Sequence, residues 1–195
     1  DVDDPLLERA MQTGVDWREL AAEQTDLFRC DMAALRVLPP DDYVAATQTI
    51  DEVVELVEML RERGLVYQLD DEYRDWYFRC SKAPAFGQVA DLDRDKMIVE
   101  FADHGGDPER PGKEDALDCL VWRQARPDEP SWPSSLGAGR PGWHIECTAI
   151  ARNRLGADFD VQGGGRDLVF PHHDMCHAEG SAVDGRPFAE AYLHV

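Results

Sequence analysis

The side chains best suited to chemistry gather in the last third of the chain. Cys147 and His172 each lie at or near the start of a predicted helix, beside a Gly- or Pro-rich turn. Thiolate and imidazole are ligands that zinc favours. Cys176 follows His172 by four residues, one helical turn along the same face, and is a candidate further ligand. On spacing alone, an isolated cysteine and histidine are more often core residues, so the metal interpretation needs further support.

Three consecutive glycines, 163–165, follow a short apolar strand predicted at 159–161. Glycine lets a ligand approach the backbone closely, and ligands of α/β proteins bind where strands end. Asp167 comes just after the glycines and can accept a hydrogen bond from an amine or a ribose hydroxyl. A plain tight turn explains the glycines equally well. Trp143 could line a small-molecule pocket, although tryptophan is usually a core residue.

Hydrophobic spacing and capping residues predict the elements that position these side chains. The pattern predicts helices at 5–14, 16–36, 49–64 and 143–151, another from Pro171, strands at 65–69, 76–79, 117–122 and 159–161, and loops at 105–112 and 126–142. The apolar stripe of the second helix is Trp17, Leu20, Leu27, Phe28 and Leu35. Because helices alternate with short apolar strands, the predicted fold class is α/β with a parallel sheet.

The chain is strongly acidic: 20 Lys and Arg against 40 Asp and Glu give a net charge of −20. No basic patch is visible, so a small-molecule partner is favoured over a nucleic acid, unless the acidity only reflects solubility or a salt-rich host. No apolar run is long enough to cross a membrane, and no signal peptide is visible. Five scattered cysteines do not suggest a disulfide framework and fit a reducing, cytoplasmic compartment. Three of them suggest no role beyond core or surface thiols: Cys30, Cys80 and Cys119.

Two strings in the last third resemble the cysteinyl-tRNA synthetases, a class I aminoacyl-tRNA synthetase family. They are Gly-Arg-Pro-Gly-Trp-His-Ile-Glu-Cys at 139–147 and Phe-Asp-Val-Gln-Gly-Gly-Gly-Arg-Asp at 159–167, which continues to Phe-Pro-His-His at 170–173. Weaker matches at Asp1-Val2-Asp3-Asp4 and Glu129-Pro130-Ser131-Trp132 extend the resemblance over nearly the whole chain.

A related family, the cysteine:glucosaminyl-inositol ligases of mycothiol biosynthesis, is the more similar of the two. The segment Asp103-His104-Gly105-Gly106-Asp107-Pro108 resembles a motif of those ligases, and Gln162 stands where the synthetases usually have histidine. The charge of −20 also disfavours tRNA as a partner. Cys176 departs from the synthetase pattern, in which a glutamate at this position is a zinc ligand, so the resemblance leaves the full set of zinc ligands open.

The resemblance implies a Rossmann-like class I catalytic domain with an inserted α/β segment. On this resemblance we expect 1–66 to be the helical part of the catalytic domain, 67–125 the inserted connective segment, and 126–195 the part with the zinc and adenylate sites. The implied activity is ATP-dependent activation of L-cysteine as cysteinyl-adenylate, followed by transfer to the amine of glucosaminyl-inositol. The runner-up is a cysteinyl-tRNA synthetase, and a third alternative is a non-catalytic zinc-binding relative.

The resemblance also implies roles for individual residues. Cys147 and His172 would hold one zinc ion, with Cys176 as a candidate, and the zinc would bind the thiolate of the substrate. Trp143 would pack beside the substrate, and the adenylate would contact Gly165, Arg166 and Asp167, with no side chain assigned to catalysis. We expect a monomer that binds neither nucleic acid nor membrane.

The same resemblance predicts motifs that the 195 residues do not contain. The family's first zinc ligand and HIGH motif are expected before Asp1, and its KMSKS loop is expected after Val195. Because those motifs bind the ATP phosphates, we expect that this stretch alone does not form adenylate.

Overall fold

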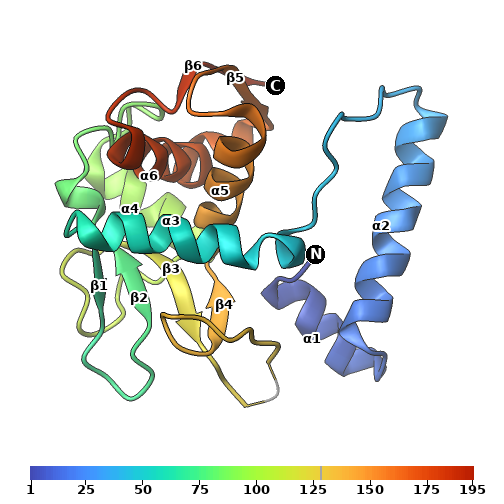
Figure 1. Cartoon of the computed structure of the whole chain (residues 1–195), viewed down its shortest axis with the longest axis horizontal. Coiled ribbons are helices and arrows are strands. Elements are labelled where there is room, and N and C mark those ends of the chain that lie inside the picture. Colours follow the sequence, from blue (N-terminus) through green and yellow to red (C-terminus); the bar gives the residue numbers. More distant parts are fainter. Residues whose placement is uncertain (128) are drawn as a thin grey trace. The chain divides into compact units, whose positions relative to one another are not determined.

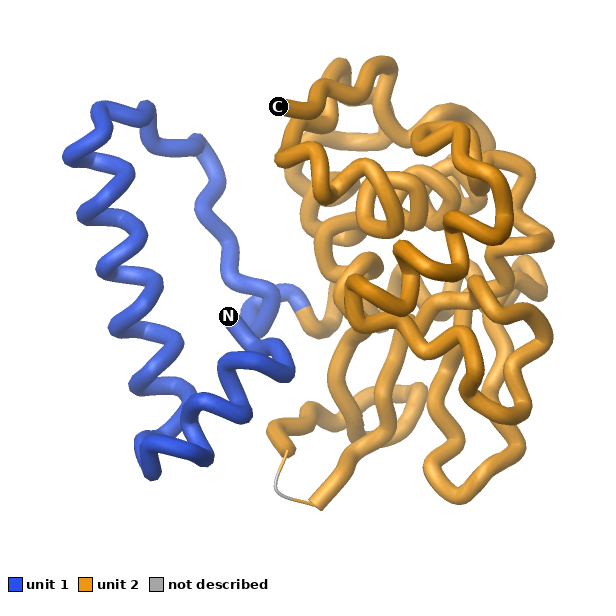
Figure 2. Tube along the Cα trace, turned by 180° about the vertical axis from the view of Figure 1, so that it is seen from behind, with its two compact units in different colours: residues 1–49 blue, residues 50–195 orange. Residues whose placement is uncertain are grey.

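A computed structural model describes residues 1–127 and 129–195, and the chain divides into two compact units. Unit 1 is Asp1–Thr49 and unit 2 is Ile50–Val195 (Figure 2). The boundaries predicted from the sequence, at 66/67 and 125/126, both fall within unit 2, and that division remains a prediction. Every residue singled out for chemistry belongs to unit 2.

Unit 1 is helical, as predicted. It contains α1 (Asp4–Thr13), α2 (Trp17–Ala34) and a 3-10 turn at Ala46–Gln48. The Asp3 carboxylate accepts from the backbone N–H of Leu6 and caps α1, and the Asp16 side chain caps α2 in the same way. The predicted apolar stripe of α2 is largely exposed: Leu27 is 54%, Phe28 49% and Leu35 69% accessible.

Unit 2 contains a four-stranded sheet in which every neighbouring pair is antiparallel. Its order is β1-β2-β3-β4, with bounds Val66–Gln68, Trp76–Phe78, Cys119–Gln124 and Gly139–Pro141. The strands follow one another in the chain and in the sheet, so no crossover helix is needed between them. The prediction of a parallel sheet is therefore wrong for these four strands.

A second sheet of unit 2 is parallel and has two strands, β5 (Phe159–Gly164) and β6 (Ala189–His194). Its crossover contains α6 (Asp174–Asp184), and α5 (Trp143–Leu155) directly precedes β5. The sequence predicts a helix from Pro171, and helical backbone does begin there: a π-helical segment, Val169–His173, is interrupted at Phe170 and continues directly into α6. Phe170, which precedes the proline, has extended backbone angles of φ −138° and ψ 137°, as residues before proline prefer.

Helix α4 (Arg94–Asp103) was not predicted, although its signals are present. Asp93 caps it by accepting from the backbone N–H of Lys96, and Met97 and Phe101, four residues apart, form its buried face. Strand β6 was also missed, because short alternating segments give weak signals.

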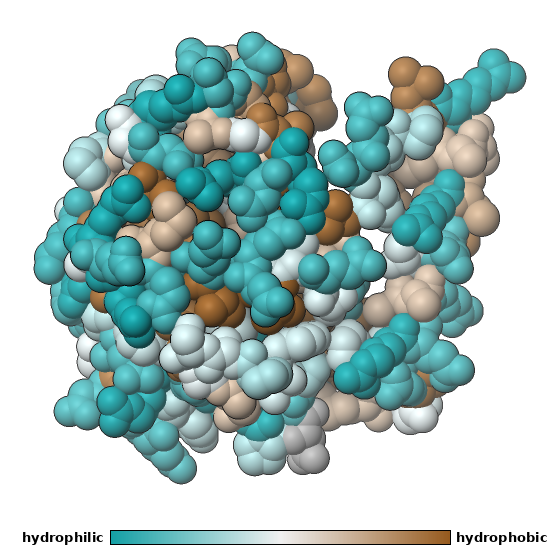
Figure 3. Space-filling view, in the orientation of Figure 1, coloured by the Kyte–Doolittle hydropathy of each residue, from teal (hydrophilic) through white to brown (hydrophobic). Residues whose placement is uncertain are grey.

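The core of unit 2 lies between α3 (Ile50–Glu62), the antiparallel sheet and helices α5 and α6 (Figure 1). The buried face of α3 consists of Ile50, Val53, Leu56, Val57 and Leu60. Phe78, Cys119 and Trp122 meet this face from the sheet. The visible outer face of unit 2 is mostly hydrophilic (Figure 3), in line with the charged residues making up 31% of the chain. Across 1–127 and 129–195, no helix combines the length and apolarity needed to span a bilayer.

Candidate functional site

The start of α5 and the turn before α6 bring the first predicted site residues together. The Trp143 ring stacks on the His172 ring with centroids 4.5 Å apart and planes 21° apart. His144 Nδ1 lies 3.1 Å from His172 Nδ1. Gly142 allows the start of α5 to lie close to β3, because a Cβ at position 142 would overlap the carbonyl of Leu120 on that strand. A glycine at the junction of β4 and α5 therefore positions the aromatic wall of the site.

Burial keeps the two bonded imidazoles neutral. It lowers the pKa of His144 well below its usual value, and it lowers the pKa of His172 to about 4. Two neutral rings joined through Nδ1 atoms share one proton in the bond, so one ring donates and the other accepts. If His172 donates, its Nε2 carries a lone pair on the side facing Cys176 Sγ, 4.0 Å away.

The two thiols of the site are held in apolar surroundings. Cys176 is fully buried, and its thiol donates to the backbone carbonyl of His144 at 3.4 Å. Cys147 packs against the cluster formed by Phe159, Cys176, Phe188 and Ala189. Burial raises the pKa of Cys147 to about 11, helped by the nearby carboxylates of Glu146 and Glu179, and it raises the pKa of Cys176 well above 9. Both thiols are thus protonated at neutral pH, and a bound metal would have to displace those protons.

The pair His172 and Cys176 fits two ligands of one zinc ion. Bonds of about 2.1 Å to nitrogen and about 2.3 Å to sulfur place two tetrahedral ligands about 3.6 Å apart, close to the observed 4.0 Å. In the described ranges, however, no three His, Cys, Asp or Glu side chains gather closely enough to hold a metal. The donor chemistry therefore fits zinc, while the complete set of ligands is not assembled here.

Residues of strands β5 and β6 lie beside the histidines of this site. Gln162 pairs in register with Tyr192, and Gly164 with His194. The Tyr192 hydroxyl lies 2.8 Å from Nδ1 of His177, and Nδ1 of His173 lies 2.7 Å from Nε2 of His194. Ring contacts and hydrogen bonds thus bring five of the six histidines to one region: His144, His172, His173, His177 and His194.

Of these five histidines, only His172 was predicted as a site residue. His144 and His173 stand inside the two strings that carried the resemblance, and adjacency to Trp143 and His172 was a usable signal. His177 and His194 had no local signal, because their roles depend on the crossover that brings β6 beside β5.

The turn after β5 carries the residues predicted to contact an adenylate. Arg166 and Asp167 are exposed, and the backbone N–H of Arg166 donates to the carbonyl of Val195 at 2.9 Å. A Cβ on Gly165 would meet the Asp167 carboxylate, so glycine lets that carboxylate fold back over the backbone. A Cβ on Gly164 would lie 2.8 Å from the His173 ring. The turn therefore adjoins the histidine cluster, and its role with adenylate remains a prediction.

Residues 1–195, the whole chain, match the family model of the tRNA synthetases class I (C) catalytic domain. The chain belongs to this family. Its mixed helices and strands are therefore those of a class I synthetase catalytic domain.

Curated relatives of this class I domain include proteins named L-cysteine:1D-myo-inositol 2-amino-2-deoxy-alpha-D-glucopyranoside ligase. Those of Nocardia farcinica and Mycolicibacterium smegmatis are each 58% identical over the whole chain and 48% of the relative. That of Streptosporangium roseum is 57% identical over the whole chain and 47% of the relative. The predicted resemblance to these ligases and to the class I synthetases is confirmed, and the chain spans about half the length of the curated relatives it matches.

The Asp103–Pro108 motif of this synthetase-family domain consists of the last residue of α4 and a loop that docks on β2. The Asp107 carboxylate accepts from the Tyr77 hydroxyl and, at 2.9 Å, from Lys113 Nζ. The Lys113 side chain is only 1% accessible. Gly106 lies so close to the Phe101 ring that any side chain there would overlap it. The motif thus builds a local structure, and no hydrogen bond or ion pair among the described residues joins it to the candidate site.

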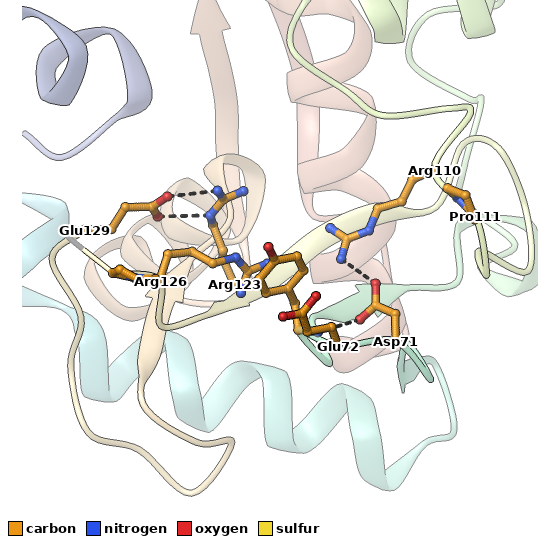
Figure 4. Close-up of a pocket in the computed structure, with 9 residues that line it drawn as sticks. Asp71, Glu72, Arg110, Pro111, Arg123, Arg126 and Glu129 are labelled. Atoms are coloured by element: carbon orange, nitrogen blue, oxygen red, sulfur yellow. Dashed lines mark hydrogen bonds and ion pairs between the residues drawn. The ribbon is translucent and has the colours of Figure 1, made fainter.

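The loop also delivers Arg110 to an open groove of about 700 Å³ at one end of the antiparallel sheet (Figure 4). Its lining consists of Asp71, Glu72, Tyr73, Arg110, Pro111, Arg123, Arg126, Pro127 and Glu129. Arg110 pairs with Asp71 at 2.9 Å and Arg123 with Glu129 at 2.9 Å. The groove is therefore a balanced set of ion pairs, separate from the histidine cluster.

Replacing Asp107 with alanine should cost about 2 kcal/mol of unfolding free energy, because the buried Lys113 ammonium would lose its carboxylate partner. The loss is smaller than for a fully buried pair because the Asp107 side chain is 37% accessible, so water already weakens the interaction. Urea denaturation measures the change. Asp103→Ala, at an exposed position of the same motif, is the matched control and should shift stability by less than about 0.5 kcal/mol. Equal effects of the two variants would contradict the assigned role of Asp107.

Proposed function

We propose that the protein containing this chain is an ATP-dependent ligase that joins L-cysteine to the amine of glucosaminyl-inositol. The observation that carries the proposal is 57–58% identity over the whole chain to relatives named for that ligation. The net charge of −20 supports a small acceptor over tRNA. In the first step the cysteine carboxylate attacks the α-phosphorus of ATP and releases pyrophosphate. In the second the amine attacks the acyl carbon and AMP leaves.

In this proposal the thiol end of cysteine binds beside Trp143 and His172. Cys147 and His172 would hold one zinc ion, with Cys176 as a candidate third ligand. When bound, zinc would coordinate the substrate thiolate and favour cysteine over serine, because a hydroxyl is a poorer zinc ligand. His144 would fix the tautomer of His172 through their Nδ1 hydrogen bond. Trp143, 44% accessible and stacked on His172, would form the outer wall.

The adenylate end would bind at the turn after β5, where Gly165, Arg166 and Asp167 lie. Exposed backbone and side chains at a strand end suit nucleotide binding. We further propose a Rossmann-like arrangement of the catalytic parts, with 67–125 as an insertion, in a monomeric cytoplasmic enzyme that does not bind nucleic acid.

Label transfer tests the proposed function directly. The complete protein is incubated with ATP and radiolabelled cysteine, with glucosaminyl-inositol and tRNA offered in parallel. Label is expected on the amino sugar. Label found only on tRNA would instead support a cysteinyl-tRNA synthetase, the second candidate, which the description of the matching family favours. Label on neither would support the non-catalytic alternative.

Replacing Cys147 with serine should lower cysteine-dependent ATP–pyrophosphate exchange by about 100-fold or more and reduce bound zinc. The substitution removes the soft sulfur of the proposed metal ligand itself. Substituting a residue that only supports a metal ligand typically costs 10- to 100-fold in metal affinity or activity, so the loss of a ligand should cost at least as much. Exchange kinetics and elemental analysis of the complete protein measure both effects. The exposed Cys30 offers the control, and Cys30→Ser should change neither quantity. Normal exchange and zinc content in Cys147→Ser would remove Cys147 from the proposed site.

A further inference from the structure

Gln162, on β5, has a buried acceptor without a partner. Its Oε1 atom is shielded from solvent and makes no hydrogen bond. Within 1–127 and 129–195, it is the only buried side-chain nitrogen or oxygen atom in this state. An unpaired buried polar group typically costs about 1–3 kcal/mol, so such an atom calls for an explanation such as a ligand that completes it.

Among the residues that the structure describes, the neighbours of Gln162 direct their donor groups elsewhere. The side chain lies beside the Cys176 thiol, where it opposes part of the rise that burial causes in the pKa of Cys176. Its register partner Tyr192 directs its hydroxyl to Nδ1 of His177. The Cys176 thiol also reaches the carbonyl of His144. The unpaired oxygen therefore belongs to a side chain of the strand that leads directly into the glycine run at 163–165.

We propose that Gln162 Oε1 accepts a hydrogen bond from the primary amine of a bound substrate. This inference rests on the proposed function, in which both cysteine and the amino sugar carry such an amine. An amide oxygen only accepts, and it does not ionise, so it complements an N–H donor at any working pH. A protonated amine would make the stronger, charge-assisted bond. Gln162 would then be a positioning and specificity residue that selects substrates with an amine.

A ligand-based double-mutant cycle in the complete protein tests this proposal. Calorimetry gives the Kd of cysteine and of 3-mercaptopropionate, which is cysteine without its amine, for the unaltered protein and for Gln162→Met. A second arm compares glucosaminyl-inositol with its 2-deoxy analogue, in which a hydrogen atom replaces the amine and no donor remains at that carbon. Methionine has a length similar to that of glutamine and lacks the acceptor. Gln162→Glu keeps an oxygen acceptor and serves as the conservative variant.

In one arm, the Kd of the amine-free analogue divided by the Kd of the amine-bearing substrate should be about 10- to 100-fold smaller in Gln162→Met than in the unaltered protein. The arm in which this ratio falls shows whether Gln162 binds the amine of cysteine or that of the amino sugar. The Kd of the amine-free analogue in that arm should stay within about two-fold, which shows that the site is still folded, and Gln162→Glu should retain the ratio.

Unchanged ratios in both arms, or equal losses for the amine and its analogue, would overturn the assignment, because a purely structural glutamine would not distinguish them. If the unaltered protein binds neither cysteine nor glucosaminyl-inositol, it is the proposed function that fails.

Discussion

Replacing Glu179 with glutamine should raise the stability of the protein at pH 8.5 by about 3–5 kcal/mol and leave it almost unchanged near pH 4. Glu179 is fully buried in α6. Burial raises its pKa from 4.5 to about 8, although hydrogen bonds from Thr148 and Cys119 oppose the rise. Glutamine has nearly the same shape and can still accept from the Thr148 hydroxyl, 2.8 Å from Oε2 in the structure.

The sign follows from where the proton is held. Below pH 4.5, Glu179 is protonated in both the folded and the unfolded chain, so its ionisation costs nothing. Between pH 4.5 and about 8 the unfolded chain releases the proton while the folded protein keeps it, and stability falls as pH rises. Glutamine has no proton to lose, so the advantage of the variant grows through this window and levels off above it.

Urea denaturation of both proteins at pH 4.5, 6.5 and 8.5 measures the growing difference. Glu190→Gln, at an exposed position on β6, is the matched control and should give a nearly constant difference. A flat difference for Glu179→Gln would mean that the carboxylate is ionised in the folded protein.

Replacing Gly142 with alanine should destabilise the protein by about 3 kcal/mol or more. A Cβ at this position would overlap the carbonyl group of Leu120, and backbone cannot yield as the end of a flexible side chain can. Relief would require β4 to move away from β3, which would also weaken the bond from the Gly142 N–H to the Val121 carbonyl, now 3.1 Å long. Thermal or urea unfolding measures the loss.

Gly163→Ala is the control for Gly142→Ala. Both glycines lie outside the left-handed region, and the nearest atom to a Cβ on Gly163, the carbonyl oxygen of Leu193, is 3.8 Å away. The control should therefore cost less than about 1 kcal/mol. A similar cost for both substitutions would show that the chain relaxes at Gly142, and that Trp143 and His144 are not held in place by this contact.

Short-range patterns explain which features of the fold could be predicted. Helix α2 followed from its Asp16 cap, and the proximity of His172 and Cys176 followed from their spacing of four. The prediction of a parallel sheet was wrong for a physical reason. The alternation of helices and strands suggested crossover connections, but the strands of the larger sheet pair in sequence order as antiparallel neighbours. The exposure of the apolar stripe of α2 could not be predicted from periodicity, because the spacing of apolar residues does not show which other element, if any, packs against them.

The site was predicted only where its residues lie close together in the strings that resemble a family. The stacking of Trp143 on His172 joins segments 29 residues apart, and the bond between His173 and His194 depends on the β5–β6 pairing. Such contacts are tertiary, and no local spacing encodes them. Gln162 was noticed as a departure from the synthetase pattern, but its unpaired oxygen is visible only in three dimensions.

The gathering of five of the six histidines gives the site a built-in spectroscopic reporter. In an NMR spectrum that shows only imidazole signals, nearly every resonance would come from this one region. The remaining histidine, His104 at the end of α4, bonds through Nδ1 to the carbonyl of Glu100 and provides an internal reference. Titrating cysteine, an adenylate analogue or zinc into the protein would then show in one experiment which of the five rings each ligand reaches.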